Sequence, residues 1–276
     1  MRHFLAFLPL LLLAACTDPA TTPDGTDGTT PTVDPAAVTD SFTYVSIEVR
    51  DSFLLDAPKL DQPAKGNFSV STIDVTNGSP EFRRLVADSL DVVYGGEVAR
   101  SSDRRAFFRA VIDTMLVNYR AEMEPELEFL EYATSAMRTV DDRTRVVLNT
   151  PDLLTVETTY YAYFGGAHGM YSTDIMTFAD NPARVLTKDD FLEVGTEEVI
   201  SGLLAEMVDP ESLFEPDAPF PVTNNNGVTK QGLKFIYPPY EIGPYAAGQF
   251  EIELPWGLLR EQGVLSAAGE ELVKGL

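Results

Sequence analysis

The sequence is poor in the residues from which metal and redox sites are usually built. Its 276 residues include one cysteine, one tryptophan and two histidines. A single cysteine, Cys16, excludes an internal disulfide, a cysteine-based zinc site and a redox pair. The histidines are His3 and His168, and a zinc site commonly needs several His or Cys ligands. We therefore expect neither a metal nor another cofactor.

Cationic side chains are scarce as well. The chain has 20 lysines and arginines against 43 aspartates and glutamates, which gives a net charge of −23. Nucleic acid repels such a chain, and no basic stripe with interleaved aromatic residues offsets the repulsion. We therefore expect no nucleic-acid partner. Two alternatives remain open, attraction of a basic partner or an acidic surface that keeps the protein soluble.

Hydrophobic runs are short except at the start of the chain. Residues 4–15, FLAFLPLLLLAA, form an apolar run, too short for the roughly 20 residues of a membrane-spanning helix. The run follows a short positive start and ends in Leu13-Ala14-Ala15-Cys16, the lipobox pattern of bacterial lipoproteins. We therefore predict a signal peptide over residues 1–15.

Cleavage before Cys16 would leave this residue at the new N-terminus, with a diacylglyceryl group on its thiol. We expect the protein to be exported and held in the bacterial cell envelope by this lipid, on the periplasmic side or at the cell surface. The alternative is an ordinary secretory signal beside an unrelated cysteine. Residues 16–40 contain no aromatic and no cationic side chain, and they predict a flexible Thr/Pro/Asp/Gly tether.

The residues after the tether alternate between strand and helix patterns. Asp103 is a plausible N-cap for the longest helix, and Pro125 should end or kink it. The patterns predict strands over residues 42–50, 67–76, 144–150, 153–164, 170–179, 233–239 and 249–256, and helices over residues 81–90, 102–130, 197–207 and 266–276. We predict an α+β fold, with a small N-terminal α+β subdomain (41–146) packed on a C-terminal domain of antiparallel or mixed sheet with helices (147–276).

One glycine-rich turn carries the only histidine beyond the signal peptide. Gly165, Gly166 and Gly169 flank His168 in FGGAHG and supply the positive φ and the close backbone approach that a tight connection or bulge requires,. A catalytic histidine would need a nucleophile and an orienting acid. Ser172 and Asp174 are near in sequence, but no G-x-S-x-G motif exists. We therefore expect His168 to be structural or a recognition side chain, and we assign no catalytic residue.

A second segment, FIYPPYEIGPYAAG, mixes tyrosines with prolines that do not fit a central strand,. One interpretation is a rigid loop that packs its tyrosines on a sheet. The other is a recognition surface, because tyrosine offers a large contact area at low entropy cost. Together the two motifs give these candidate recognition residues: Tyr163, Gly165, Gly166, His168, Gly169, Tyr237, Tyr240 and Tyr245.

These motifs resemble the RsiV-like C-terminal domain family. Its members share a Tyr-x-Gly-Gly-Ala-His-Gly turn, seen here at residues 163–169, and a Phe-x-x-x-Pro-Tyr-Glu-Ile-x-Pro-Tyr-x-x-Gly segment, seen here at residues 235–248. The specific resemblance covers residues 144–262, and residues 41–146 resemble a PdaC-type N-terminal region by their layout. The resemblance implies an α+β fold without established catalytic residues and, by analogy with the anti-sigma-factor members, lysozyme binding.

The sequence departs from the anti-sigma type because it has neither a cytosolic segment nor a transmembrane helix. We expect a lipid-anchored, non-catalytic envelope protein that binds a lysozyme-like basic protein or peptidoglycan. Two alternatives stay open. One is an enzyme that modifies cell-wall glycan with His168 and nearby acids, and the other is a purely structural envelope lipoprotein.

Overall fold

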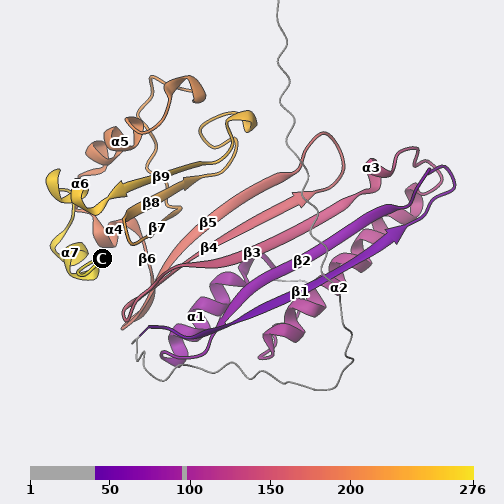
Figure 1. Cartoon of the computed structure of the whole chain (residues 1–276), viewed down its shortest axis with the longest axis horizontal. Coiled ribbons are helices and arrows are strands. Elements are labelled where there is room, and N and C mark those ends of the chain that lie inside the picture. Colours follow the sequence, from indigo (N-terminus) through magenta and orange to yellow (C-terminus); the bar gives the residue numbers. More distant parts are fainter. Residues whose placement is uncertain (1–40, 95–97) are drawn as a thin grey trace, which may run out of the picture. The chain divides into compact units, whose positions relative to one another are not determined.

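The computed structural model describes residues 41–94 and 98–276 (Figure 1). The predicted signal peptide, the tether and Cys16 lie outside the described residues. The described residues form nine strands in two sheets, of six and three strands, together with seven α-helices. The predicted α+β fold class is therefore confirmed. Within the described ranges, no helix is long and apolar enough to cross a bilayer.

The larger sheet has its strands in chain order. They are β1 (Tyr44–Leu55), β2 (Ala64–Val75), β3 (Arg138–Asn149), β4 (Leu153–Tyr163), β5 (Met170–Asp180) and β6 (Ala183–Leu186). All neighbours pair antiparallel except β2 and β3, which are parallel. A parallel pair needs a long crossover, and the chain between β2 and β3 supplies it with α1 (Pro80–Leu90), α2 (Arg104–Met123) and α3 (Ala133–Ala136).

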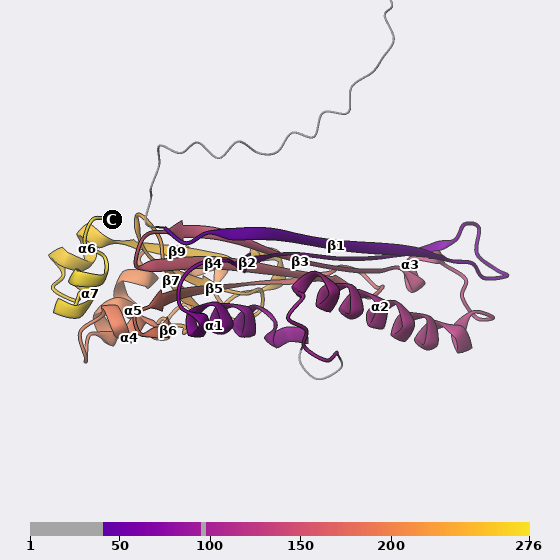
Figure 2. The same ribbon diagram turned by 90° about the horizontal axis from the view of Figure 1, so that it is seen from below.

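The two longer crossover helices lie on one face of this sheet (Figure 2). Ser79 caps α1 by accepting a hydrogen bond from Phe82 N, with Pro80 in the first helical position,. Asp103 caps α2 in the same way through Ala106 N. The helix ends at Met123, before the 3₁₀ turn that contains Pro125. The N-cap at Asp103 and the end of the helix near Pro125 are confirmed, and the helix stops seven residues before the end of the predicted range, residues 102–130.

The helices cover the sheet with two clusters of buried side chains. The cluster under α2 includes Phe107, Phe108 and Ile112, packed on the middle of β1, β2 and β3. The cluster under α1 includes Phe82 and Val86, packed on β2, β4 and β5. The apolar side chains of α2 that face the sheet are therefore core.

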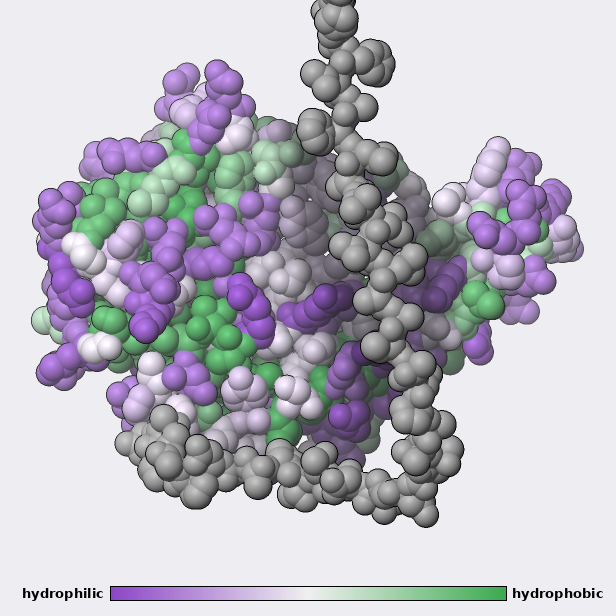
Figure 3. Space-filling model, viewed as in Figure 1, coloured by the Kyte–Doolittle hydropathy of each residue, from purple (hydrophilic) through white to green (hydrophobic). Residues whose placement is uncertain are grey.

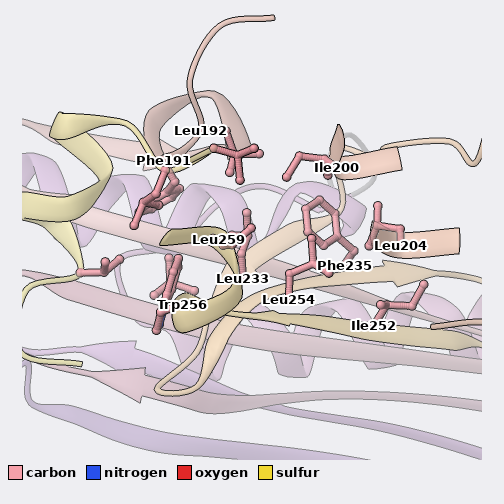
Figure 4. Close-up of a cluster of buried hydrophobic side chains, with 14 of the residues drawn as sticks. Phe191, Leu192, Ile200, Leu204, Leu233, Phe235, Ile252, Leu254, Trp256 and Leu259 are labelled. Atoms are coloured by element: carbon pink, nitrogen blue, oxygen red, sulfur yellow. The ribbon is translucent and has the colours of Figure 1, made fainter. Parts of the chain in front are cut away.

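The smaller sheet is antiparallel and has its own core. It contains β7 (Asn226–Val228), β8 (Gly232–Tyr237) and β9 (Phe250–Pro255). Four helices accompany it: α4 (Lys188–Phe191), α5 (Glu197–Ala205), α6 (Trp256–Glu261) and α7 (Ala267–Leu272). Figure 4 shows the cluster that joins them, which includes Phe191, Ile200, Leu204, Leu233, Phe235, Leu254, Trp256 and Leu259. On the face seen in Figure 3, hydrophobic side chains gather over this region among hydrophilic ones.

Polar contacts join the smaller sheet to β4 and β5. Val228 N donates to Thr177 Oγ1 at 2.9 Å, and Lys234 Nζ donates to the buried carboxylate of Glu157 at 2.9 Å. Asn225, just before β7, bonds the backbone of β5 through both ends of its side-chain amide. The smaller sheet is therefore fixed against the larger one by named hydrogen bonds as well as by apolar packing.

The structure adds details that the sequence patterns lack. Strand β3 begins at Arg138, six residues before the predicted strand, and β6 and β7 were not predicted. Strand β7 has three residues and lies in a segment for which the sequence patterns predicted neither a strand nor a helix. The expected boundary between residues 146 and 147 falls inside β3, so residues on both sides of it build one continuous sheet.

One buried carboxylate lies beneath the helices. Asp142 on β3 is 3% exposed and accepts a hydrogen bond from the hydroxyl of Tyr94. Burial raises the pKa of Asp142 to about 6 from its ordinary value of 3.8, although the Tyr94 bond opposes the shift. The folded state therefore holds more protons than the unfolded state between about pH 4 and 6, and this group's contribution to stability falls as the pH rises through that window.

We predict that Asp142→Asn stabilises the protein at neutral pH. Asparagine keeps an acceptor for Tyr94 and removes the buried charge, so the free energy of unfolding should rise by up to about 3 kcal/mol at pH 7.5. Urea denaturation at pH 7.5 and at pH 4 measures the effect, and the gain should shrink at pH 4. Asp152→Asn, at an exposed position, is the control. A gain that is the same at both pH values would contradict the assignment.

Candidate recognition site

The glycine-rich turn joins β4 to β5 and bends sharply at two positions. Gly165 and Gly166 have φ of 85° and 98°, which L side chains rarely adopt,. A Cβ on Gly165 would also lie 2.8 Å from the carbonyl oxygen of Ser135, so the turn packs closely on the segment before β3. Tyr163 Oη donates to Gly166 O at 2.9 Å. These contacts explain why the turn is rich in glycine.

The last glycine of the motif has a different role. Gly169 is buried, and a Cβ on it would lie 2.5 Å from the Tyr161 ring. Tyr161 on β4 is directly opposite Tyr171 on β5 in the strand register. The absence of a side chain at Gly169 therefore lets this tyrosine lie across the end of the hairpin.

His168 packs on a tyrosine from the second motif. The rings of His168 and Tyr245 stack with their centroids 4.0 Å apart and an interplanar angle of 23°. Tyr245 Oη donates to Gly169 O at 2.7 Å, and His168 Nδ1 lies 2.9 Å from the same oxygen. A carbonyl oxygen only accepts, so Nδ1 carries the proton in this bond. The structure thus brings together two motifs that are 76 residues apart in the chain.

Two more tyrosines extend the stack. Tyr240 is tilted at 33° to Tyr245 with centroids 5.7 Å apart, and Tyr171 meets the Tyr245 ring edge-on at 6.2 Å. His168 and Tyr240 are exposed, whereas Tyr171 and Tyr245 are half-buried. We call these four residues the aromatic surface. Such rings offer flat apolar faces and hydroxyl groups to a ligand.

Tyr240 holds an unusual backbone conformation. Its φ is 73°, and among the described residues no other residue besides glycine has a positive φ. A bulky residue in this region is strained. The turn fixes it, because Tyr240 N donates to Gly243 O at 3.1 Å and Glu241 N donates to Pro238 O at 3.1 Å. The surrounding turn therefore holds an exposed tyrosine in a costly conformation, which is typical of functional positions.

The chemistry available at the aromatic surface is that of neutral hydrogen bonding and stacking. Burial raises the pKa of the Tyr245 hydroxyl, and the neighbouring tyrosines raise it further. This hydroxyl is therefore neutral and acts as a donor at physiological pH. Gln249 N donates to Tyr171 Oη at 3.2 Å, so the Tyr171 hydroxyl is held in place as well.

Ser172 and Asp174, which follow the glycine turn in the sequence, do not face the aromatic surface. Side chains alternate between the two faces of a strand, so Ser172 and Asp174 lie on the opposite face of β5 from Tyr171. There Asp174 helps to raise the pKa of Asp142 beneath the helices. Within the described part of the chain, no ion pair joins His168 to a carboxylate, and no group of three His, Cys, Asp or Glu side chains could hold a metal ion.

One predicted recognition residue is wrong. Tyr237 is the last residue of β8 and is fully buried, and its hydroxyl donates to Pro221 O at 2.7 Å. Its ring packs edge-on against Phe220 in the core of the smaller sheet. The prolines begin only after Tyr237, so the strand pattern continues up to this residue and directs its side chain inward.

Three further residues, Tyr161, Tyr171 and Gln249, belong to the site and were not predicted from the sequence. A signal was present, because Tyr161 and Tyr163 alternate along one predicted strand and Tyr171 begins the next. In a hairpin that closes at the glycine turn, Tyr161 and Tyr171 are near neighbours. Their position beside Tyr245 could not be predicted, because it depends on how the two sheets pack.

Comparisons with known proteins identify a family of unknown function. Residues 188–257 match the model of the family described as "Protein of unknown function (DUF3298)". A crystal structure of a DUF3298 family member from Bacteroides fragilis superposes with a TM-score of 0.69 at 20% identity and covers 85% of this chain and 98% of that one. No curated protein matches the chain.

A second solved structure, a DUF3298 family protein from Pseudomonas aeruginosa PAO1, superposes with a TM-score of 0.52 at 20% identity. It covers 82% of this chain and 96% of that one. At this identity the likeness concerns the fold. The chain therefore carries a DUF3298 domain at residues 188–257. This range contains Tyr240 and Tyr245, whereas His168 and Tyr171 come from the hairpin before it.

We predict that Gly169→Ala lowers the free energy of unfolding by about 1–3 kcal/mol, because its Cβ would overlap the Tyr161 ring,. Urea denaturation measures the change. Gly257→Ala in α6 is the matched control, since a Cβ there meets no atom within 4 Å, and its stability should be unchanged or slightly raised. Adding Tyr161→Ala should relieve the overlap in the first variant. Equal losses in both glycine variants would contradict this packing.

Proposed function

We propose that the protein is a lipid-anchored, non-catalytic component of the bacterial cell envelope that binds a cell-wall-related ligand at the aromatic surface. The preferred ligand is a lysozyme-like basic protein, and peptidoglycan is the second candidate. The observation that carries the proposal is the stacking of His168 on Tyr245, which unites the two motifs into one exposed surface. Cys16 is the proposed site of lipid attachment.

The finer family assignment belongs to the same proposal. The convergence of the Tyr-x-Gly-Gly-Ala-His-Gly turn with the Pro-Tyr-Glu-Ile-x-Pro-Tyr segment supports an RsiV-like domain, because the motif residues are in contact. The PdaC-type assignment of residues 41–146 is supported by the layout of β1, β2 and the crossover helices. In this proposal the chain is a receptor or inhibitor module.

Charge favours the basic protein over peptidoglycan. The chain carries a net charge of −23, and complementary charge speeds the encounter with a cationic partner. Glu241 lies beside Tyr240 in the chain and adds an exposed acidic side chain there. Exposed Phe164 and Met170 flank the glycine turn and add apolar contact area. A partner surface with basic and apolar side chains suits this combination.

Experiments distinguish the two candidate ligands from each other. They also distinguish the proposed binding function from a glycan-modifying enzyme and from a purely structural lipoprotein. Sugar rings stack on aromatic faces as protein side chains do, and a neutral glycan would bind with little dependence on salt. A cell-wall glycan-modifying enzyme that uses His168 would lose about 10²- to 10⁴-fold of its activity in His168→Ala. In a purely structural lipoprotein, neither ligand would bind.

We expect a fragment of residues 39–276 to bind lysozyme, with an affinity that falls as salt is raised from about 20 to 200 mM. The described residues of this fragment form one compact unit with its own cores. Tyr240→Ala should weaken binding about 30-fold, the loss expected for an anchor residue worth about 2 kcal/mol. Isothermal titration calorimetry against lysozyme and a sedimentation assay with purified peptidoglycan measure the two affinities.

Tyr132→Ala is the matched control, because Tyr132 is 68% exposed and lies before α3, outside the aromatic surface. The Tyr132→Ala variant should bind lysozyme with the same affinity as the unmodified chain. Tyr245→Phe keeps the stacked ring and loses only the bond to Gly169 O, so it should weaken binding less than Tyr240→Ala. Retention of neither lysozyme nor peptidoglycan would refute the proposal.

A further inference from the structure

Arginines line a cleft that is formed by residues 74–104, which precede the residues of the aromatic surface in the sequence. The cleft has a volume of about 570 Å³ and lies between the end of β2, α1 and the start of α2. Four of the chain's 20 lysines and arginines line it: Arg83, Arg84, Arg100 and Arg104. In a chain with a net charge of −23, such a concentration of cations needs a reason.

Acids inside the cleft account for only two of the four arginines. Arg100 pairs with Asp88, and Arg104 pairs with Asp91 through Nη1 and Oδ2 at 2.8 Å. Asp74 lies 3.7 Å from Arg104 Nε. The two remaining arginines, at positions 83 and 84, are exposed and form no ion pair with any described residue. The cleft therefore keeps two free guanidinium groups.

Arg104 also has N–H groups that lack a hydrogen-bond acceptor among the described residues. It is 7% exposed, and within the described residues its Nε and Nη2 have no hydrogen-bond partner. Nη1 is paired with Asp91 and the guanidinium lies over the Phe108 ring, but N–H groups of a buried guanidinium that lack an acceptor are costly,. Asp91 Oδ1 beside it also lacks a donor in the same part of the chain. A group with several acceptor oxygens and one hydroxyl would satisfy both residues at once.

Backbone and hydroxyl donors also lie near the cleft. Helix α2 begins at Arg104, after Ser101, Ser102 and the N-cap Asp103, whose carboxylate already accepts a hydrogen bond from Ala106 N. The N-terminus of a helix carries a partial positive charge and unpaired N–H groups. The Ser101 and Ser102 side chains line the cleft and offer hydroxyl groups. Because Asp103 occupies the helix end, the groups that match the chemistry of an oxyanion are the hydroxyls and the guanidinium forks,.

We propose that this cleft binds a phosphate group, either as free phosphate or as a phosphate monoester in a lipid headgroup. Guanidinium forks bind phosphate oxygens in pairs, and Arg83 and Arg84 provide free forks. The protonated oxygen of hydrogen phosphate can donate to Asp91, while its other oxygens accept from Arg104. This site is independent of the proposed ligand of the aromatic surface.

The test compares phosphate binding by the full chain and by two sets of variants. Titration with sodium phosphate at low ionic strength, followed by calorimetry, measures the dissociation constant, with sodium chloride at matched ionic strength as the reference. Replacing both exposed arginines, Arg83→Gln with Arg84→Gln, should weaken binding about tenfold or more. Arg143→Gln is the matched control, because Arg143 is exposed on β3 outside the cleft.

Arg104→Lys keeps the charge and removes the fork, so it should also weaken phosphate binding if the protein remains folded by circular dichroism. If it does not fold, the double variant of the exposed arginines decides alone. Vesicles of phosphatidylcholine with and without phosphatidic acid separate the two sources. Binding to vesicles alone, lost in the double variant, identifies a headgroup phosphate. Absence of binding to either probe, or equal binding by the double variant and the Arg143 control, would overturn the proposal.

Discussion

Among the contacts that attach the smaller sheet to the larger one, the side-chain amide of Asn225 bonds the backbone of β5 at both of its ends. Asn225 Oδ1 accepts from Ile175 N at 2.9 Å, and Asn225 Nδ2 donates to Thr173 O at 2.8 Å. Strand β6 pairs with β5 only from Thr177 onward, so the asparagine provides the bonds that a further strand would form. Backbone groups without partners are costly when buried. This pair of bonds therefore fixes the start of the smaller sheet against β5, and the position of the second motif follows from it.

The aromatic surface is a consequence of this attachment. The larger sheet presents the glycine turn at the end of β4 and β5, and the smaller sheet presents the Pro-Tyr segment between β8 and β9. Stacking of His168 on Tyr245 and the bond from Tyr245 to Gly169 O join the two. Neither motif forms the surface alone. In the structure His168 stacks one ring face on Tyr245, and its Nδ1 bonds a carbonyl oxygen.

Local patterns in the sequence predicted most of the elements and little of their assembly. The cap at Asp103, the end of α2 near Pro125 and the strand alternation of β1, β2, β4 and β5 follow from neighbouring residues, and the structure confirms them. Strand β7 and the role of Asn225 could not be predicted, because they arise from contacts between segments about 50 residues apart. Tyr237 was misassigned because the nearby prolines suggested a loop, whereas the strand continues to that residue. Gly165 and Gly166 were recognised correctly as positive-φ positions, since a tight turn requires them.

Hydrogen–deuterium exchange with and without lysozyme, at low salt, tests most directly whether the aromatic surface is the recognition site. The account predicts that bound lysozyme slows exchange in residues 163–171 and 240–248, which come from the two motifs, and leaves α2 and the hairpin of β1 and β2 unchanged. The account would be contradicted if lysozyme slowed exchange in other segments but not in residues 163–171 and 240–248. It would also be contradicted if exchange were the same with and without lysozyme.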